Sequence, residues 1–374
     1  ALYPYIPDSC ADDFAAFEQR IESEFEALYP EVDLVLRPMQ AAGDFYDYAY
    51  LEKLLAQYDL VELDSIFLGH LIQDRLIVPW GSFVCNNPDW QQVPQSICQQ
   101  ASYYAYPHWQ CAYFAFGRAP ALVGITNSTE FLDLLAAVPP TQIPLAINLN
   151  GKHTVANMYM DALTDANKNA TLPWDDLLSS RKLAWDAVER MANYTCTPWG
   201  GQPALNGVYQ KHNRLAHYAF ARAFAAFYIG SSESFADIKP WLSGNASGIQ
   251  AIHAPWGRYH NPTIMVDSWV LSRNISEQKR YYAECFAKYI TAPETYAWMI
   301  LGQDCPVQSQ GRYLLPATRS AYTQSPIGQD PMMLQFAQAI DRGANPMPID
   351  KYSSIIKRLG AALHQSLLND TQCP

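Results

Sequence analysis

Charged residues are scarce in this chain, and their scarcity excludes several classes of protein. Asp, Glu, Lys and Arg make up only 16% of the 374 residues, and the balance is acidic, with a formal net charge of −11 at pH 7. A nucleic-acid-binding surface needs a basic patch, and none stands out in the sequence, so we expect no nucleic-acid partner. An acidic cleft would suit a cationic ligand instead.

Long apolar runs, metal-ligand spacings and phosphate-binding loops are also missing. No stretch approaches the roughly 18 apolar residues of a membrane-spanning helix, so we expect no membrane partner. No glycine-rich phosphate loop is present, and we expect no cofactor. The cysteines include no C-x-x-C pair and have no His-x-x-x-His companion, which argues against a zinc site. They stand at positions 10, 85, 98, 111, 196, 285, 305 and 373.

Acceptor sequences for N-linked sugars are more frequent than chance would give. The 16 asparagines would produce roughly two Asn-x-Ser/Thr sequons at random. This excess indicates the eukaryotic secretory route, where oxidising conditions allow disulfides such as one between Cys85 and Cys98. We therefore predict a secreted glycoprotein whose signal peptide has been removed before Ala1. The six sequons begin at Asn127, Asn169, Asn193, Asn245, Asn274 and Asn369.

The length and the apolar content predict two lobes of α/β structure. The 374 residues exceed the roughly 250–300 at which a single core stops growing. Hydrophobic residues make up 49% of the chain, which is enough to form two cores. Residues 1–80 alternate between strand and helix patterns, which predicts a mainly parallel sheet flanked by helices. Ligands bind beyond the carboxyl ends of such strands, where residues 5–8 and Asp64 fall. The strands are expected at 2–6, 32–37 and 60–63, and the helices at 12–28, 46–57 and 65–73.

A second α/β region is expected to follow an aromatic strand at 104–116. This strand carries Cys111, and it is the best candidate for a segment that crosses between lobes, because the pattern of elements starts afresh on either side of it. Beyond it, strands are predicted at 145–148, 227–230 and 263–272. Helices are predicted at 128–137, 154–165, 175–193, 215–226, 277–291, 293–301, 331–342 and 349–368.

Two apolar stretches far apart in the chain each carry one reactive side chain. Cys111 lies in the aromatic strand, and Glu233 follows the apolar run 227–230. A cysteine attacks as the thiolate, which is a minor species at neutral pH unless a nearby group favours it, so Glu233 could serve as the activating base. On spacing alone the plainer alternatives are favoured: a disulfide at Cys111, and a helix-capping or surface carboxylate at Glu233.

Two aspartates are further candidates. Asp64 ends an apolar strand and precedes a helix, so it is either an N-cap or a site residue. Asp267 lies inside the apolar stretch 264–270, where a charged side chain must find a partner or face a cavity. The segment 230–233 lacks the second glycine of a serine-hydrolase elbow, which makes that alternative weak.

Five segments of the chain carry a family resemblance. They are Ala1-Leu2-Tyr3-Pro4-Tyr5-Ile6-Pro7-Asp8, Leu63-Asp64-Ser65-Ile66-Phe67-Leu68, the strand that ends in Cys111, Gly230-Ser231-Ser232-Glu233-Ser234, and Arg312-Tyr313-Leu314-Leu315-Pro316-Ala317. Their order and spacing resemble thiaminase I, the bacterial thiamine pyridinylase family, over nearly the whole chain. The resemblance implies the fold of periplasmic solute-binding proteins, with a ligand cleft between two lobes. The lobes would comprise residues 1–112 with about 264–325, and residues 113–263 with about 326–374.

The resemblance also implies roles for individual residues. Cys111 falls on the family's nucleophile and Glu233 on its catalytic glutamate, while Tyr5, Asp64 and Asp267 fall on substrate-binding positions. The implied reaction is addition of the Cys111 thiolate to the pyrimidine of thiamine, departure of the thiazole, and displacement of the enzyme by a second nucleophile. The expected partners are therefore a cationic or heteroaromatic small molecule and a small nucleophile.

Two positions differ from the family pattern. Ser231 and Met265 stand where the family has tyrosines that wall the pyrimidine, which predicts a wider or differently shaped pocket. The retained pair of Cys111 and Glu233 favours an enzyme. The altered wall favours a non-catalytic extracellular glycoprotein that binds a small molecule in the same two-lobed cleft. A structural glycoprotein would leave the thiol and the acid in the apolar strand unexplained.

Overall fold

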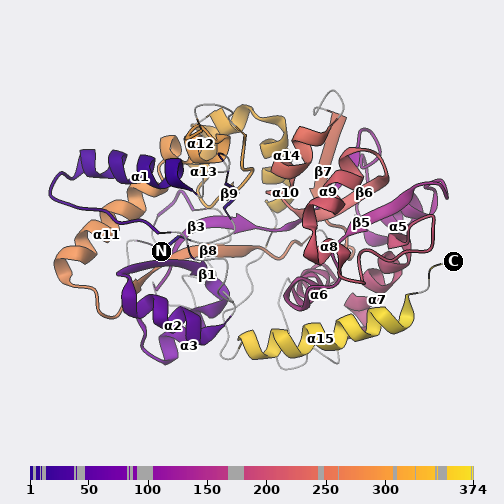
Figure 1. Ribbon diagram of the computed structural model, residues 1–374, viewed down its shortest axis with the longest axis horizontal. Helices are drawn as coiled ribbons and strands as arrows, with labels where there is room; N and C mark the ends of the chain where they lie inside the picture. Colours follow the sequence, from indigo (N-terminus) through magenta and orange to yellow (C-terminus); the bar gives the residue numbers. More distant parts are fainter. Residues whose placement is uncertain are drawn as a thin grey trace. The chain divides into compact units, whose positions relative to one another are not determined.

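A computed structural model divides the chain into two compact α/β units (Figure 1), as the sequence predicts. Unit 1 comprises Ala1–Cys111, Met265–Met333 and Met347–Ser353. Unit 2 comprises Ala112–Ile264, Leu334–Pro346 and Ser354–Pro374. The structure describes residues 1–2, 6–8, 10, 14–37, 39, 47–81, 84, 87–90, 104–166, 181–242, 248–259, 261–305, 310–324, 326–341, 343, 352–371 and 373.

The sheet of unit 1 is built around one central strand, β8 (Met265–Ser272). Its neighbours are β1 (Leu60–Asp64), β3 (Tyr106–Cys111) and β2 (Ile77–Val78), each antiparallel to β8. The strand β9 (Leu315–Pro316) pairs with β3. Ala1 lies along the β1 edge in parallel, because its amine donates to the Leu60 carbonyl at 2.6 Å and the Glu62 N–H donates to the Ala1 carbonyl at 2.9 Å. The Leu2 N–H donates to the Arg37 carbonyl at 2.8 Å.

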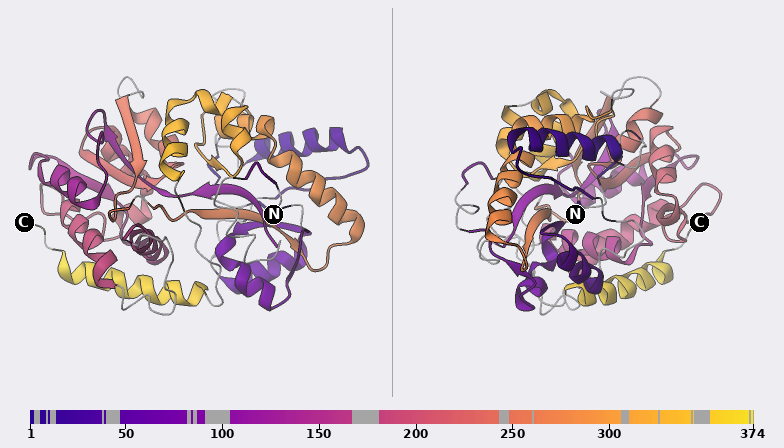
Figure 2. Two further views of the ribbon diagram at one scale, coloured as in Figure 1. Left: turned by 180° about the vertical axis from the view of Figure 1, so that it is seen from behind. Right: turned by 60° about the vertical axis from the view of Figure 1, so that its left-hand side comes forward.

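Helices flank the sheet of unit 1, and α1 (Ala15–Leu28) shows why they form. Its apolar residues Phe17, Ile21 and Phe25 recur every four positions and are all buried on one face. The Phe17 ring packs edge-on against Trp298 at 5.7 Å, and the Phe25 ring packs against Phe286 at 5.4 Å. As a result α1 lies beside α11 (Figures 1 and 2). The other helices of the unit are α2 (Tyr48–Gln57), η1 (Ser65–Phe67), α3 (Leu68–Gln73), α11 (Glu277–Ile290), α12 (Pro293–Leu301), α13 (Arg319–Thr323) and η6 (Pro326–Gln329).

The sheet of unit 2 has the order β5-β6-β4-β7. The strands β5 (Ile143–Ile147) and β6 (Ala225–Ser231) are parallel, whereas β4 (Tyr113–Arg118) is antiparallel to both β6 and β7 (Ile249–His253). The flanking helices are α5 (Ser128–Ala136), α6 (Lys152–Ala166), α7 (Arg181–Ala192), η3 (Asn193–Thr195), α8 (Val208–Lys211), α9 (Asn213–Ala221), α10 (Ser234–Ile238) and η4 (Lys239–Trp241). Two further helices, α14 (Pro331–Ile340) and α15 (Tyr352–Asp370), have their first residues in unit 1 and the rest in unit 2.

The two-lobed α/β class agrees with the prediction, but the expectation of mainly parallel sheets is wrong, because among the described strands only β5 and β6 pair in parallel. The strands β1 and β3 run the same way because both are antiparallel to β8, which lies between them. In the same way β6 and β7 are separated by the oppositely directed β4. The strands β8 and β4 are each the first strand that forms after the chain passes from the other unit. They therefore arrive without the helical crossover that makes consecutive strands parallel.

The predicted aromatic strand at 104–116 is two strands in the structure. It is interrupted at Ala112, so that β3 belongs to the sheet of unit 1 and β4 to the sheet of unit 2. Residues 32–37, also predicted as a strand, are irregular apart from the hydrogen bond with Leu2. No helix within the described ranges is both long enough and apolar enough to cross a membrane.

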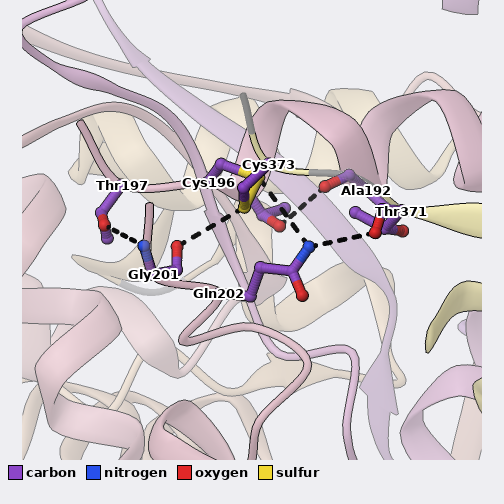
Figure 3. Close-up of a disulfide and its surroundings, with 8 residues drawn as sticks. Ala192, Cys196, Thr197, Gly201, Gln202, Thr371 and Cys373 are labelled. Carbon is purple, nitrogen blue, oxygen red and sulfur yellow. Dashed lines mark hydrogen bonds between the residues drawn. A yellow bond between two sulfur atoms is a disulfide. The ribbon is translucent and has the colours of Figure 1, made fainter. Parts of the chain in front are cut away.

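A disulfide within unit 2 joins Cys196, just after η3, to Cys373 near the chain end (Figure 3). The two residues are 177 positions apart in sequence, and their Cα atoms are 5.5 Å apart. Nearby, the Gln202 side-chain amide donates to the Thr371 carbonyl at 3.3 Å. The disulfide predicted between positions 85 and 98 lies outside the described residues.

Candidate functional site

The register of β8 brings several predicted site residues of unit 1 onto one face of its sheet. Asp267 pairs with Asp64 of β1 on one side and with Trp109 of β3 on the other, and Met265 pairs with Cys111. Directly opposed residues point to the same face, and so do alternate residues along a strand. Asp64 and Cys111 are also the last residues of β1 and β3. The carboxyl ends of two strands with the same direction therefore meet at one edge of this face.

Asp64 and Asp267 are two buried carboxylates on neighbouring strands, with only 3% and 8% of their surfaces exposed. Asp64 is the N-cap of η1 and accepts a hydrogen bond from the Ile66 N–H at 3.1 Å. Burial raises the pKa of Asp64 to about 7, although the Ile66 hydrogen bond acts in the opposite direction. Asp64 is thus both the N-cap and a neighbour of Asp267, so the two sequence alternatives are compatible.

Cys111 ends β3 and is partly exposed. It carries a thiol rather than a disulfide, so the half-cystine alternative finds no support in the structure. A partly exposed thiol at a strand end can be reached by a ligand and by a base, which a buried structural cysteine cannot.

Glu233 belongs to unit 2, in the turn between β6 and α10. It occupies the N-cap position of α10, but its side chain makes no capping hydrogen bond, which argues against the capping alternative. The Ser232 hydroxyl donates to Glu233 Oε2 at 3.3 Å. Burial raises the pKa of Glu233, while hydrogen bonds from its own N–H and from the Ser231 and Ser232 hydroxyls act to lower it. A carboxylate with a raised pKa is a better proton acceptor near neutral pH.

A buried pair of Glu62 and His108 was missed by the sequence reasoning. Glu62 lies two residues before Asp64 on β1, and therefore on the same face. It hydrogen-bonds to His108 Nδ1, at the point where the register between β3 and β8 shifts. Both side chains are fully buried, and the Tyr296 hydroxyl donates to the His108 carbonyl at 2.5 Å. The available signal was a second acid, Glu62, in an apolar strand.

The motif that begins at Arg312 has a structural role that the sequence did not reveal. The buried Arg312 guanidinium makes two hydrogen bonds with the Asp304 carboxylate, at 2.6 and 2.7 Å. Its Nε donates to the Pro7 carbonyl at 2.7 Å. Arg312 therefore anchors the segment that follows Tyr5, a predicted substrate-binding residue that lies outside the described residues.

Four of the six predicted glycosylation sites fall within the described residues. Asn193, Asn274 and Asn369 are exposed. Asn127 is partly exposed and is the N-cap of α5, where its Oδ1 accepts from the Glu130 N–H at 3.0 Å. Attachment of a sugar to Nδ2 would leave that cap in place. The sequons at 169 and 245 lie outside the described residues.

Comparison with known proteins finds similarity to thiaminase I. No family model matches the chain. Thiaminase-1 of Paenibacillus thiaminolyticus is 25% identical over 362 residues, which cover 92% of this chain and 81% of that protein. The structure of Clostridium botulinum thiaminase I in complex with thiamin matches with a TM-score of 0.76 and 17% identity, over 98% of this chain and 100% of that chain. The chain is therefore similar to thiaminase I in sequence and shares its fold.

The thiaminase I fold is shared with solute-binding proteins. The sugar-binding protein MalE from Xanthomonas citri matches this chain with a TM-score of 0.72 and 14% identity, over 96% of this chain and 90% of that chain. Within this fold, Met265 lies directly opposite Cys111, and Ser231 precedes the Ser232-Glu233 pair. Both positions that depart from the family pattern therefore lie next to a candidate catalytic residue.

Proposed function

We propose that the protein is a thiaminase I-like transferase. It would cleave thiamine, or a related pyrimidine or heteroaromatic compound, through a covalent cysteine adduct and transfer the pyrimidine to a nucleophile. The observation that supports this most directly is the β8 register, because it gathers Cys111, Asp64 and Asp267 on one face in a chain that is similar to thiaminase-1. Glu233 supplies a carboxylate whose raised pKa suits a general base.

The proposed reaction needs no oxidant and no metal. Glu233 takes the proton of the Cys111 thiol, and the thiolate sulfur forms a bond to the pyrimidine moiety. The carbon–nitrogen bond to the thiazole breaks, and the thiazole nitrogen keeps the electron pair and becomes neutral. A second nucleophile then forms a bond to the pyrimidine moiety and releases the Cys111 sulfur as a thiolate. Glu233 returns its proton to this sulfur and removes the proton of the nucleophile, which restores the resting enzyme.

The paired aspartates suit a substrate of this kind. Two acidic side chains on one face complement a cationic ring, and Asp64, whose pKa is raised to about 7, can donate a hydrogen bond when it is protonated. Tyr5 would add an aromatic contact. The wall positions Ser231 and Met265 leave room for a substrate other than thiamine itself.

Secretion and glycosylation are part of the proposal. Six sequons support them, together with the exposure of Asn193, Asn274 and Asn369 and the disulfide between Cys196 and Cys373. Mass spectrometry of the protein from its native secretions tests this, because sugars on these asparagines would add mass that a glycosidase removes.

The activity is tested by incubating the protein with thiamine and an aromatic amine or a thiol. We expect release of the thiazole, and we expect Cys111→Ser to lower its rate at least about 1,000-fold because a hydroxyl is a far weaker nucleophile than a thiolate. Cys285→Ser is the matched control, since Cys285 lies in α11 and takes no part in the proposed site. Full activity in Cys111→Ser would contradict the proposal.

The alternative is a non-catalytic extracellular protein that binds a small molecule in the same fold. The replacement of two wall tyrosines by Ser231 and Met265 favours it. Calorimetry separates the two: thiamine that binds at micromolar concentration but releases no thiazole with any nucleophile identifies the binding protein.

A further inference from the structure

A chain of hydrogen-bonding side chains starts beside Glu233 and runs entirely within unit 2. We call it the Tyr228 chain. The Tyr228 hydroxyl donates to Ser234 Oγ at 3.0 Å, and His217 Nε2 lies 2.9 Å from the same hydroxyl. Its members, in order from Glu233, are Ser231, Ser234, Tyr228, His217 and Asp237.

The two ends of the Tyr228 chain meet different groups. At one end, Ser231 Oγ lies 3.5 Å from Ser234 Oγ, and the Ser231 hydroxyl acts to lower the pKa of Glu233. At the other end, His217 Nδ1 lies 3.1 Å from Asp237 Oδ2. The chain therefore connects the candidate base with a second carboxylate, which is 31% exposed.

The backbone of β6 is shaped for this arrangement. Tyr228 and Gly230 are two residues apart and share a face of the strand. A Cβ atom at position 230 would stand only 2.1 Å from the Tyr228 hydroxyl. The glycine thus lets the tyrosine ring fold along its own strand, so that its hydroxyl reaches Ser234 in the next turn.

The donors in the Tyr228 chain can all point toward Glu233. Burial raises the pKa of Tyr228, so its hydroxyl keeps its proton and can donate to Ser234. His217 must then donate to the tyrosine oxygen from Nε2, because that oxygen has already given its own proton. Ser234 in turn donates to Ser231, and Ser231 donates to Glu233.

We propose that the Tyr228 chain is a positioning network that keeps Glu233 ionised, and so able to accept a proton from the substrate or the nucleophile. This inference rests on the proposed function for the role of Glu233. Tyr228, Ser234, His217 and Asp237 need not touch the substrate. They act by orienting the Ser231 hydroxyl toward the carboxylate.

The other charged groups near the chain support this arrangement. Arg214 on α9 lies 3.5 Å from Asp237 Oδ1, and Lys239 follows α10 in η4. Burial acts to raise the pKa of Asp237. The neighbouring His217 and Arg214 have the opposite effect, and together they bring this pKa below its ordinary value. Asp237 is therefore favoured in its ionised form beside His217.

The experiment compares Tyr228→Phe with the parent protein. Phenylalanine keeps the ring and removes the hydroxyl, so Glu233 should lose its oriented donor and titrate at a higher pH. We expect the carboxyl-carbon NMR signal of Glu233 to titrate at least about half a pH unit higher. Tyr209→Phe is the matched control because Tyr209, also a buried tyrosine of unit 2, is not a member of the chain, and it should cause no shift.

Further variants separate positioning from general damage. Ser234→Ala should give a similar shift, and the double variant with Tyr228→Phe should give no more than the larger single shift, since both interrupt one chain. In kinetics, the acid limb of the pH profile of kcat/KM should move up by the same amount, while the rate on the high-pH plateau is retained.

Two outcomes would overturn the inference. One is a Glu233 titration that is the same in Tyr228→Phe, Ser234→Ala and the parent protein. The other is a uniform loss of activity at all pH values with no shift of the acid limb. The NMR titration needs no turnover, so a parent protein that fails to cleave thiamine would remove the proposed function without deciding whether the Tyr228 chain controls Glu233.

Discussion

Asp64 is a carboxyl group whose burial changes its behaviour with pH. Its pKa in the folded protein is about 7, whereas an aspartate in an unfolded chain has a pKa of about 4. Between these two values the folded state binds a proton that the unfolded state has lost. The stability contributed by Asp64 is therefore fully present below about pH 4 and is lost as the pH rises toward 7.

Asp64→Asn should remove this dependence. Asparagine resembles the protonated carboxyl group and is a good N-cap, so the geometry at η1 is kept. We expect the free energy of unfolding at pH 8 to rise by on the order of 2–4 kcal/mol and to change little at pH 4. Urea unfolding at the two pH values measures it. Asp47→Asn is the control, because Asp47 is an N-cap of the same unit on the exposed surface.

Equal stabilities of the parent and Asp64→Asn at pH 8 would show that Asp64 is not buried in the way described. The substitution should also weaken binding of a cationic ligand, since it removes one of the two acids. A gain in stability with a loss of binding is the expected signature of a functional group held in an unfavourable setting.

At the scale of elements, β6 depends on the absence of a side chain at one position. Gly230→Ala would place a methyl group 2.1 Å from the Tyr228 hydroxyl, and the buried tyrosine ring has little room to move. We expect the free energy of unfolding to fall by about 1–3 kcal/mol, as in other overpacked cores.

Gly248→Ala provides the matched control for this prediction. Gly248 also belongs to unit 2, but a Cβ atom there would meet nothing within 4 Å. Its substitution should change stability by less than about 0.5 kcal/mol. Chemical denaturation of both variants under one set of conditions compares them, and a Gly230→Ala protein as stable as Gly248→Ala would show that the ring can move aside.

The helices were more predictable than the strands. The patterns at 128–137 and 277–291 correspond closely to α5 (Ser128–Ala136) and α11 (Glu277–Ile290), because a helix forms from contacts three and four residues apart. The strand β7 (Ile249–His253) was missed, and residues 32–37 were wrongly predicted as a strand. Whether an extended segment joins a sheet depends on distant partners that a local pattern does not contain.

At the scale of the whole molecule, the disulfide between Cys196 and Cys373 closes a loop of 177 positions within unit 2. Replacing both cysteines by serine frees this loop in the unfolded chain and should lower the free energy of unfolding by about 2–5 kcal/mol. Two units can unfold separately, so hydrogen exchange of unit 2 amides is the suitable measurement. Cys285→Ser is the control, and unchanged protection in the double variant would contradict the prediction.

The sequence by itself determined the α/β class and most helices, because apolar periodicity acts over a few residues. It also identified Cys111 and Glu233 as reactive side chains, and Asp64 and Asp267 as charged side chains in apolar strands. The tertiary structure decided which of them are neighbours. The central position of β8 sets Asp267 opposite Asp64 and Met265 opposite Cys111. That position follows from long-range strand pairing, in which a shift of one residue would turn every side chain to the other face.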